Sequence, residues 1–206
     1  MTLTAWFSLA SICILGAMSP GPSLAVVLKN TLAGGRAEGV KTAVAHGLGV
    51  GLYAFATAAG LAVLITGSPA LFQGVQWLGA FFLAYLGVKA LLGNTGIAEA
   101  AKTEVDFGHK GHGFRVGFLA AFLNPKLALF FAALFSQFVS ADAQLPEKML
   151  MALIAALIDA GWYLLVVLVL SQSQVLGALR HRANVLDKTF GVLLILLAVR
   201  LFATVS

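Results

Sequence analysis

Apolar residues along this chain gather in long stretches that are separated by short polar links. A helix of about 20 mostly apolar residues is long enough to cross the hydrocarbon core of a bilayer. Stretches of that kind occur at about 4–28, 42–66, 70–92, 114–139, 149–170 and 189–205. The pattern predicts an all-α integral membrane protein with six transmembrane helices.

Two of the six stretches are interrupted by proline motifs. The first contains Ser19-Pro20-Gly21-Pro22-Ser23, and the fourth contains Asn124-Pro125-Lys126. Proline lacks a backbone N–H and cannot continue a helix, and lipid offers no partner to the carbonyl groups that it leaves free. Such irregular backbone is tolerated at membrane depth where protein or a wet cavity surrounds it. We therefore expect helices one and four to be broken at these motifs and the breaks to line a substrate pathway.

The position of the two breaks divides the chain into halves. Repeat one covers about 1–93, a polar linker covers about 94–113, and repeat two covers about 114–206. Each repeat holds three predicted spans and begins with the broken one. Because three is an odd number, the second repeat enters the membrane in the opposite direction, which predicts a 3+3 inverted repeat within a single transmembrane domain, 1–206.

Composition and charge agree with a membrane protein. The chain is 60% apolar and 10% charged, with a mean hydropathy of +0.97, whereas a soluble domain carries about 25% charged residues. The net charge of +5 comes from basic residues in the links between spans, which excludes a continuous surface for nucleic acid.

Most of the basic residues fall between spans one and two, three and four, and five and six: Lys29, Arg36, Lys41, Lys102, Lys110, Arg115, Arg180, Arg182 and Lys188. The positive-inside rule then places these links in the cytoplasm and both termini outside it.

Charged residues inside predicted spans are the strongest candidates for function. An ionised group at the centre of a membrane helix costs about 2.5–3.5 kcal/mol on insertion scales, so Asp159 and Lys126 should face a cavity or a partner. Trp162 and Tyr163 follow Asp159 at i+3 and i+4 and would flank its carboxylate. The alternative is structural: Asp159 pairs with Lys126 or Asn124, and Lys126 caps free carbonyl groups.

The histidines and the cysteine carry weaker signals. His46, near the start of the second span, is either an interfacial histidine or a proton carrier. His109 and His112 offer two metal ligands in the linker, fewer than a metal site needs, and a solvated loop is the favoured interpretation. Cys13 is the sole cysteine, which excludes a redox carrier that uses a cysteine pair within one chain. We expect no cofactor, no bound metal and no enzymatic activity.

The motifs together resemble a known family. Ser19-Pro20-Gly21-Pro22, Gly47-x-Gly49-x-Gly51, Phe122-Leu123-Asn124-Pro125-Lys126 and the lone Asp159 are similar to motifs of the LysE/RhtB family of bacterial amino-acid exporters, over essentially the whole chain. The resemblance implies a multi-pass carrier of the bacterial inner membrane, with periplasmic termini, that exports amino acids or close derivatives by proton antiport. It also suggests a homodimer as one assembly. The residues that match the family motifs are Pro20, Gly21, Pro22, Asn124, Pro125, Lys126 and Asp159.

A transport mechanism follows as a hypothesis. Half-helix N-termini at the breaks, or Lys126, would receive the carboxylate of an amino acid, and Asp159 or free carbonyl groups would receive its ammonium. Protonation of Asp159 would then release the ammonium. A divalent metal-ion exporter or a channel on the same scaffold, or a membrane assembly factor that transports nothing, remain alternatives.

Overall fold

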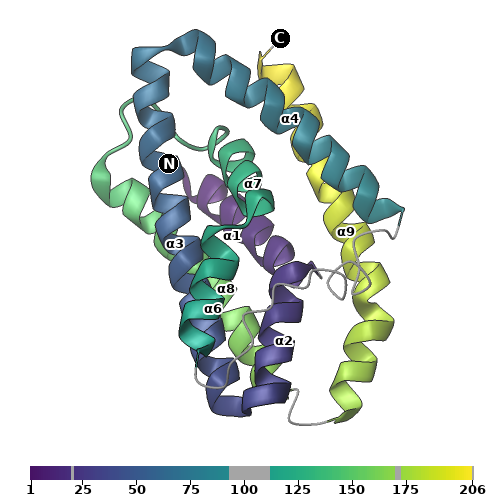
Figure 1. The fold of residues 1–206 in the computed structure, drawn as a ribbon. Helices are drawn as coiled ribbons and strands as arrows, with labels where there is room; N and C mark the ends of the chain where they lie inside the picture. The colour runs from purple at the N-terminus through teal and green to yellow at the C-terminus, as the bar shows by residue number, and fades with distance from the viewer. Residues whose placement is uncertain (20, 93–111, 170–172, 206) are drawn as a thin grey trace.

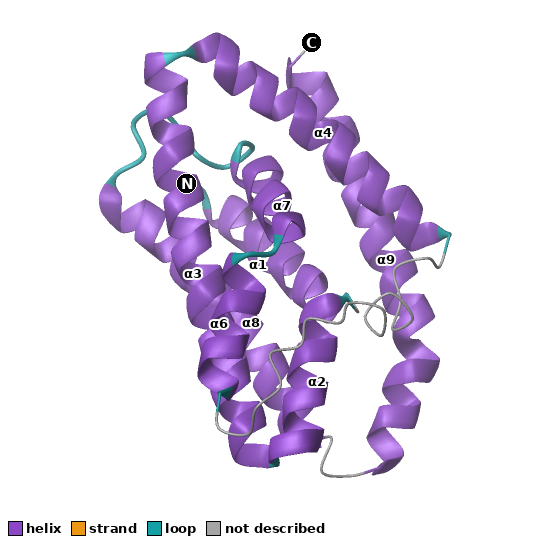
Figure 2. Cartoon of the chain, in the orientation of Figure 1, coloured by secondary structure: helices purple, strands orange, loops and turns teal. Residues whose placement is uncertain are grey.

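The structure of the protein is a computed structural model that describes residues 1–19, 21–92, 112–169 and 173–205. These residues form α-helices joined by short turns and loops, and the described part of the chain contains no strand (Figure 2). The predicted all-α class is therefore confirmed. The helices are α1 (Leu3–Met18), α2 (Pro22–Gly34), α3 (Arg36–Gly67), α4 (Pro69–Leu91), α6 (Gly113–Phe122), α7 (Pro125–Phe135), α8 (Leu145–Val169) and α9 (Ser173–Val205).

Both proline motifs break a helix, as predicted. The axes of α1 and α2 meet at an angle of 56°, and those of α6 and α7 at 53°. Pro22 is the first residue of α2 and Pro125 the first residue of α7, which is the helix position where a missing N–H costs least. Pro20 lies outside the described residues.

The number of candidate membrane spans is smaller than the sequence predicts. Among the described residues, three helices are long and apolar enough to cross a membrane, namely α3, α4 and α8, and the count becomes five if each bent pair is one span. The sixth predicted span, 189–205, lies in the second half of α9 and stays a prediction.

Two predicted polar links are helical instead. The link that holds Arg180, Arg182 and Lys188 belongs to α9, which begins at Ser173, and α3 begins at Arg36, although the predicted span begins at 42. The hydropathy pattern locates the apolar part of a helix, but polar residues with adequate helix propensity extend it into water. The predicted linker 94–113 lies outside the described residues except for its last two positions.

Small residues bring α3 into close contact with two neighbours. A Cβ atom added at Gly47 would lie 2.6 Å from the Cβ of Ala160, and one added at Gly51 would lie 2.9 Å from the Cβ of Ala156, both in α8. Gly49, on another face of α3, is equally close to α6. The glycines of the second span therefore serve helix packing, as small-xxx-small patterns do. Helix α4 packs beside α9 at the other side of the bundle (Figure 1).

Both termini lie at one end of the bundle (Figure 1). The turn between α3 and α4 and the loop between α7 and α8 lie at that same end. The turn between α2 and α3 and the start of α6 lie at the other end. The α2–α3 turn needs one residue, Gly35, whose φ of 80° is readily adopted by glycine.

We expect Gly47→Ala to destabilise the protein, because the new methyl group overlaps Ala160 and the carbonyl oxygen of Ala156. Overpacking of this kind costs about 1–3 kcal/mol. The matched control is Gly60→Ala in the same helix, where no atom lies within 4 Å of the added Cβ. Thermal unfolding of the purified variants in detergent checks this: equal unfolding temperatures would contradict the packing role of Gly47.

Candidate functional site

The two helix breaks line a single internal cavity of about 60 Å³. The first break contributes Ser19, Gly21, Pro22 and Ser23, and the second contributes Asn124 and Lys126. His46 of α3 and Asp159 and Tyr163 of α8 complete its polar lining. The cavity thus brings together most of the residues that the sequence singled out.

The N-terminus of α2 opens toward this cavity. Gly21 is the N-cap residue, with an extended backbone and no side chain that could accept a hydrogen bond from the helix. Pro22 follows and has no N–H, so the first backbone donor of α2 belongs to Ser23. A helix N-terminus carries a partial positive charge and favours an anion.

The N-terminus of α7 is built differently, because Asn124 caps it. The Oδ1 atom of Asn124 accepts a hydrogen bond of 3.0 Å from the backbone N–H of Lys126. The Nζ atom of Lys126 lies 3.7 Å from the position that a Cβ of Gly21 would occupy. The side chain of the second break therefore reaches the backbone of the first, in the space left by the missing side chain of Gly21.

Asp159 is paired with His46. The Oδ2 atom of Asp159 lies 2.6 Å from Nδ1 of His46, and the two side chains come from α8 and α3. The residues are 7% and 1% exposed, so the contact is shielded from water. Because an ionised carboxylate only accepts hydrogen bonds, Nδ1 of the imidazole is the donor. From the sequence, Lys126 and Asn124 were the alternatives for a structural partner of Asp159, and His46 was either an interfacial histidine or a proton carrier. The structure instead buries His46 beside the carboxylate.

Tyr163 packs against the same histidine, and Trp162 does not. The ring of Tyr163 meets that of His46 edge-on, with 5.0 Å between the centroids, and its hydroxyl is hydrogen-bonded to the side chain of Ser23. Trp162 packs instead against a separate apolar cluster that includes Leu24. Of the predicted aromatic pair, Tyr163 alone lines the cavity.

The remaining lining is apolar and largely aromatic. Phe130 and Phe131 of α7, Phe190 of α9, Val50 of α3 and Leu127 of α7 face the cavity. A cavity with charged groups and a hydrocarbon wall suits a small molecule that has a polar head and an apolar side chain. Among the described residues, no group of three or more His, Cys, Asp or Glu side chains could hold a metal ion.

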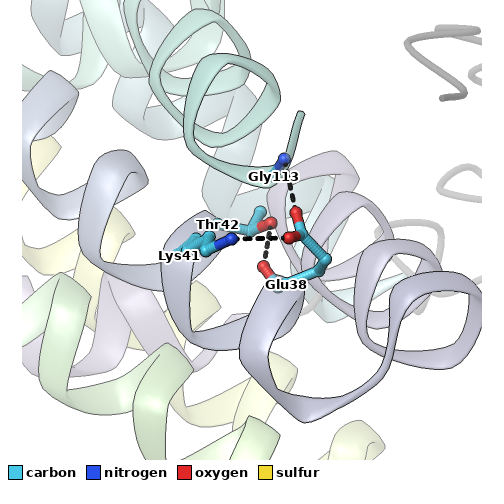
Figure 3. Close-up of polar contacts among 4 residues, drawn as sticks. All are labelled: Glu38, Lys41, Thr42 and Gly113. Atoms are coloured by element: carbon cyan, nitrogen blue, oxygen red, sulfur yellow. Dashed lines mark hydrogen bonds and ion pairs between the residues drawn. The ribbon is translucent and has the colours of Figure 1, made fainter. Parts of the chain in front are cut away.

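A polar cluster fastens α3 to α6 at the end where both helices begin (Figure 3). Glu38 accepts a hydrogen bond of 2.9 Å from the backbone N–H of Gly113 and forms an ion pair of 2.8 Å with Lys41. The hydroxyl of Thr42 donates to the carbonyl oxygen of Glu38 at 2.7 Å. Glu38 therefore occupies the N-terminus of α6. No sequence motif indicates this contact, because Gly113 is distant from Glu38 along the chain.

A second cavity, of about 360 Å³, lies at the end that holds the termini. Its polar lining comes from the start of α1, the segment after α7 and the last turns of α9. The residues are Thr2, Thr4, Ser8, Gln137, Ser140 and Arg200. Nothing in the sequence identifies this region, because hydroxyl groups near helix ends are common and these residues form no recognisable motif.

Comparison with known proteins gives a consistent result. Residues 14–204 match the LysE type translocator family. The leucine efflux proteins of Salmonella choleraesuis and Salmonella typhimurium are each 33% identical over 187 residues, which is 88% of this chain and 87% of theirs. An uncharacterized membrane protein of Pseudomonas aeruginosa is 35% identical over 149 residues, 68% of either chain. No solved structure gives a significant match.

We expect Asn124→Ala to destabilise the start of α7, because the backbone N–H of Lys126 loses its hydrogen-bond acceptor. Loss of an N-cap side chain costs about 0.5–2 kcal/mol. Asn124→Ser restores an acceptor at the cap and should recover most of that stability. Thermal unfolding of both variants in detergent checks this, and equal losses in the two variants would show that capping is not the role of Asn124.

Proposed function

This chain belongs to the LysE type translocator family, and from that membership we propose that it is a secondary transporter that exports amino acids, or close derivatives, from the bacterial cytoplasm. The family is one of transporters, not enzymes. The observation that carries the proposal is the cavity where the two helix breaks, a lysine and a buried carboxylate meet. Broken helices at matching places in two halves form the substrate sites of many transporters.

The substrate class that fits best is an amino acid with an aliphatic side chain. Two of the three relatives named above are leucine efflux proteins, and the cavity wall of Phe130, Phe131, Phe190, Val50 and Leu127 is apolar. Burial of a leucine side chain against such a wall contributes about 1.5–3 kcal/mol. A charged side chain would lose its hydration there without gaining a partner.

The polar lining supplies a place for each charge of the zwitterion. The uncapped N-terminus of α2 and the ammonium of Lys126 lie next to each other and would bind the carboxylate. The carboxylate of Asp159, at the opposite polar wall, would bind the ammonium. Asn124 has a structural role in this arrangement, because its side chain already caps α7.

Proton antiport is the energy source that we propose. Asp159 lies in the cavity with His46 as its partner. Addition of a proton from outside to this pair would weaken the attraction of the pair for the ammonium of the substrate. Release outward and proton entry would then be coupled. The topology that we propose is six spans in a 3+3 inverted repeat in the inner membrane, with both termini periplasmic and a homodimer as the assembly to test.

The size of the central cavity limits what it can hold. One water molecule needs roughly 10–15 Å³ on this measure, so a cavity of about 60 Å³ holds a few waters and not a whole amino acid. The substrate therefore enters when the helices around the cavity separate, which is the movement that alternating access requires.

The test is uptake of a panel of radiolabelled amino acids into inside-out vesicles that contain the purified protein, with and without an imposed proton gradient. Saturable, gradient-dependent uptake of leucine and other aliphatic amino acids, well above that of lysine and glutamate, is the expected result. If the folded protein moves no amino acid in either condition, the proposed function is wrong.

We expect Asp159→Asn to leave the protein folded in the membrane and to abolish proton-driven export. Truncation of one partner of a buried charge pair at a binding interface costs about 2–5 kcal/mol of affinity, so uptake should fall to background. Asp142→Asn is the matched control, because Asp142 is an exposed acid in the loop before α8. The vesicle assay measures both variants, and an unchanged rate for Asp159→Asn would remove Asp159 from the pathway.

A further inference from the structure

His46 has one ring nitrogen in use and one without a partner. Its Nδ1 donates to Asp159 at 2.6 Å, while its Nε2 is buried and has no hydrogen-bond partner among the described residues. The residue is 1% exposed and lines the central cavity. A buried polar atom that stays unpaired destabilises the protein, so a partner that is present in only part of the transport cycle would account for it.

The hydrogen bond to Asp159 fixes the chemistry of the free nitrogen. With Nδ1–H donated to the carboxylate, the neutral imidazole presents a lone pair at Nε2. In that state the pair carries one net negative charge and attracts an ammonium group. When a proton adds to Nε2, the ring becomes a cation beside an ionised carboxylate, and the pair is neutral overall.

We propose that Nε2 of His46 is the atom that takes up the transported proton, while Asp159 remains ionised throughout the cycle. This inference rests on the proposed function and specifies its coupling step. The substrate ammonium binds when Nε2 is bare, because the net negative charge and the free lone pair both favour it. A proton on Nε2 removes that charge and directs an N–H at the ammonium, so the amino acid is released.

The other titratable groups of the cavity are already engaged or differently placed. From α8, Asp159 binds Nδ1, and Tyr163 has its hydroxyl bonded to Ser23. From α7, Lys126 reaches toward Gly21 at the first break. From α1, Cys13 is a buried thiol. The linings that α2 and α9 contribute hold no titratable side chain. Nε2 is therefore the acceptor that these groups leave open.

The first experiment separates binding from coupling with His46→Asn. An Asn amide keeps a donor near the position of Nδ1 for Asp159 and has nothing at the position of Nε2. We expect gradient-driven accumulation of leucine in proteoliposomes to be lost. Exchange without a pH gradient should become weaker, because the ammonium keeps Asp159 but loses the lone pair of Nε2. The effect of pH on leucine affinity, expected to be about 5- to 150-fold as for other coupled sites, should vanish. Asp159→Asn, in contrast, should lose exchange as well.

The second experiment follows His46 directly, so it does not depend on whether His46→Asn folds. The other histidines, His109, His112 and His181, are replaced by glutamine, and nitrogen NMR of labelled histidine then reports His46 alone. At a pH above that at which His46 gains its second proton, Nδ1 should be protonated and Nε2 should carry no proton. At a lower pH both nitrogens should be protonated. Saturating leucine should move the titration to lower pH, because the ammonium competes with the proton.

The outcomes separate this inference from the function on which it rests. If wild-type protein moves no amino acid, the proposed function fails, while the NMR titration still reports on His46. If wild-type protein couples leucine to protons and His46→Asn does so equally well, the inference is overturned and the function stands. An Nε2 that keeps one protonation state over the pH range of transport would overturn it too.

Discussion

A polar group inside the membrane needs a partner from the protein, since lipid provides none. Two pairs of helices in this protein, each apolar enough to make one membrane span together, are bent at a break, and both breaks line one cavity. The two are satisfied unequally: Asn124 caps α7, whereas Gly21 leaves the start of α2 without a side-chain cap. The cavity is therefore lined by one helix N-terminus with a side-chain cap and one without.

The buried pair of His46 and Asp159 is not explained by stability. Desolvation of two charged groups usually offsets their attraction, and apolar residues of similar volume in such places are often equally stable or more so. The neighbours of this pair are well packed: Gly47 next to His46 lies against Ala160 next to Asp159. Close backbone packing thus sets the 2.6 Å contact between the two side chains.

The sequence predicted the features that depend on local chemistry. Proline at positions 22 and 125 placed both breaks. Features that depend on the arrangement of distant segments were missed: His46 and Asp159 are 113 positions apart, and no motif connects them. A signal existed, since a helix face of small residues marks where α8 docks and His46 adjoins that face. The helical start of α9 was missed because hydropathy reports on lipid contact and not on helix formation.

The polar contacts of the interior join the first half of the chain to the second. His46 of α3 binds Asp159 of α8, Lys126 of α7 reaches Gly21 before α2, and Glu38 of α3 binds the start of α6. A movement of one half against the other would lengthen these contacts together, because each has one partner in each half. The two helix breaks, the buried His46–Asp159 pair and the Glu38 contact are therefore linked by geometry. A separation of the halves would disturb all three at once, so none of these contacts can be broken independently of the others by such a movement.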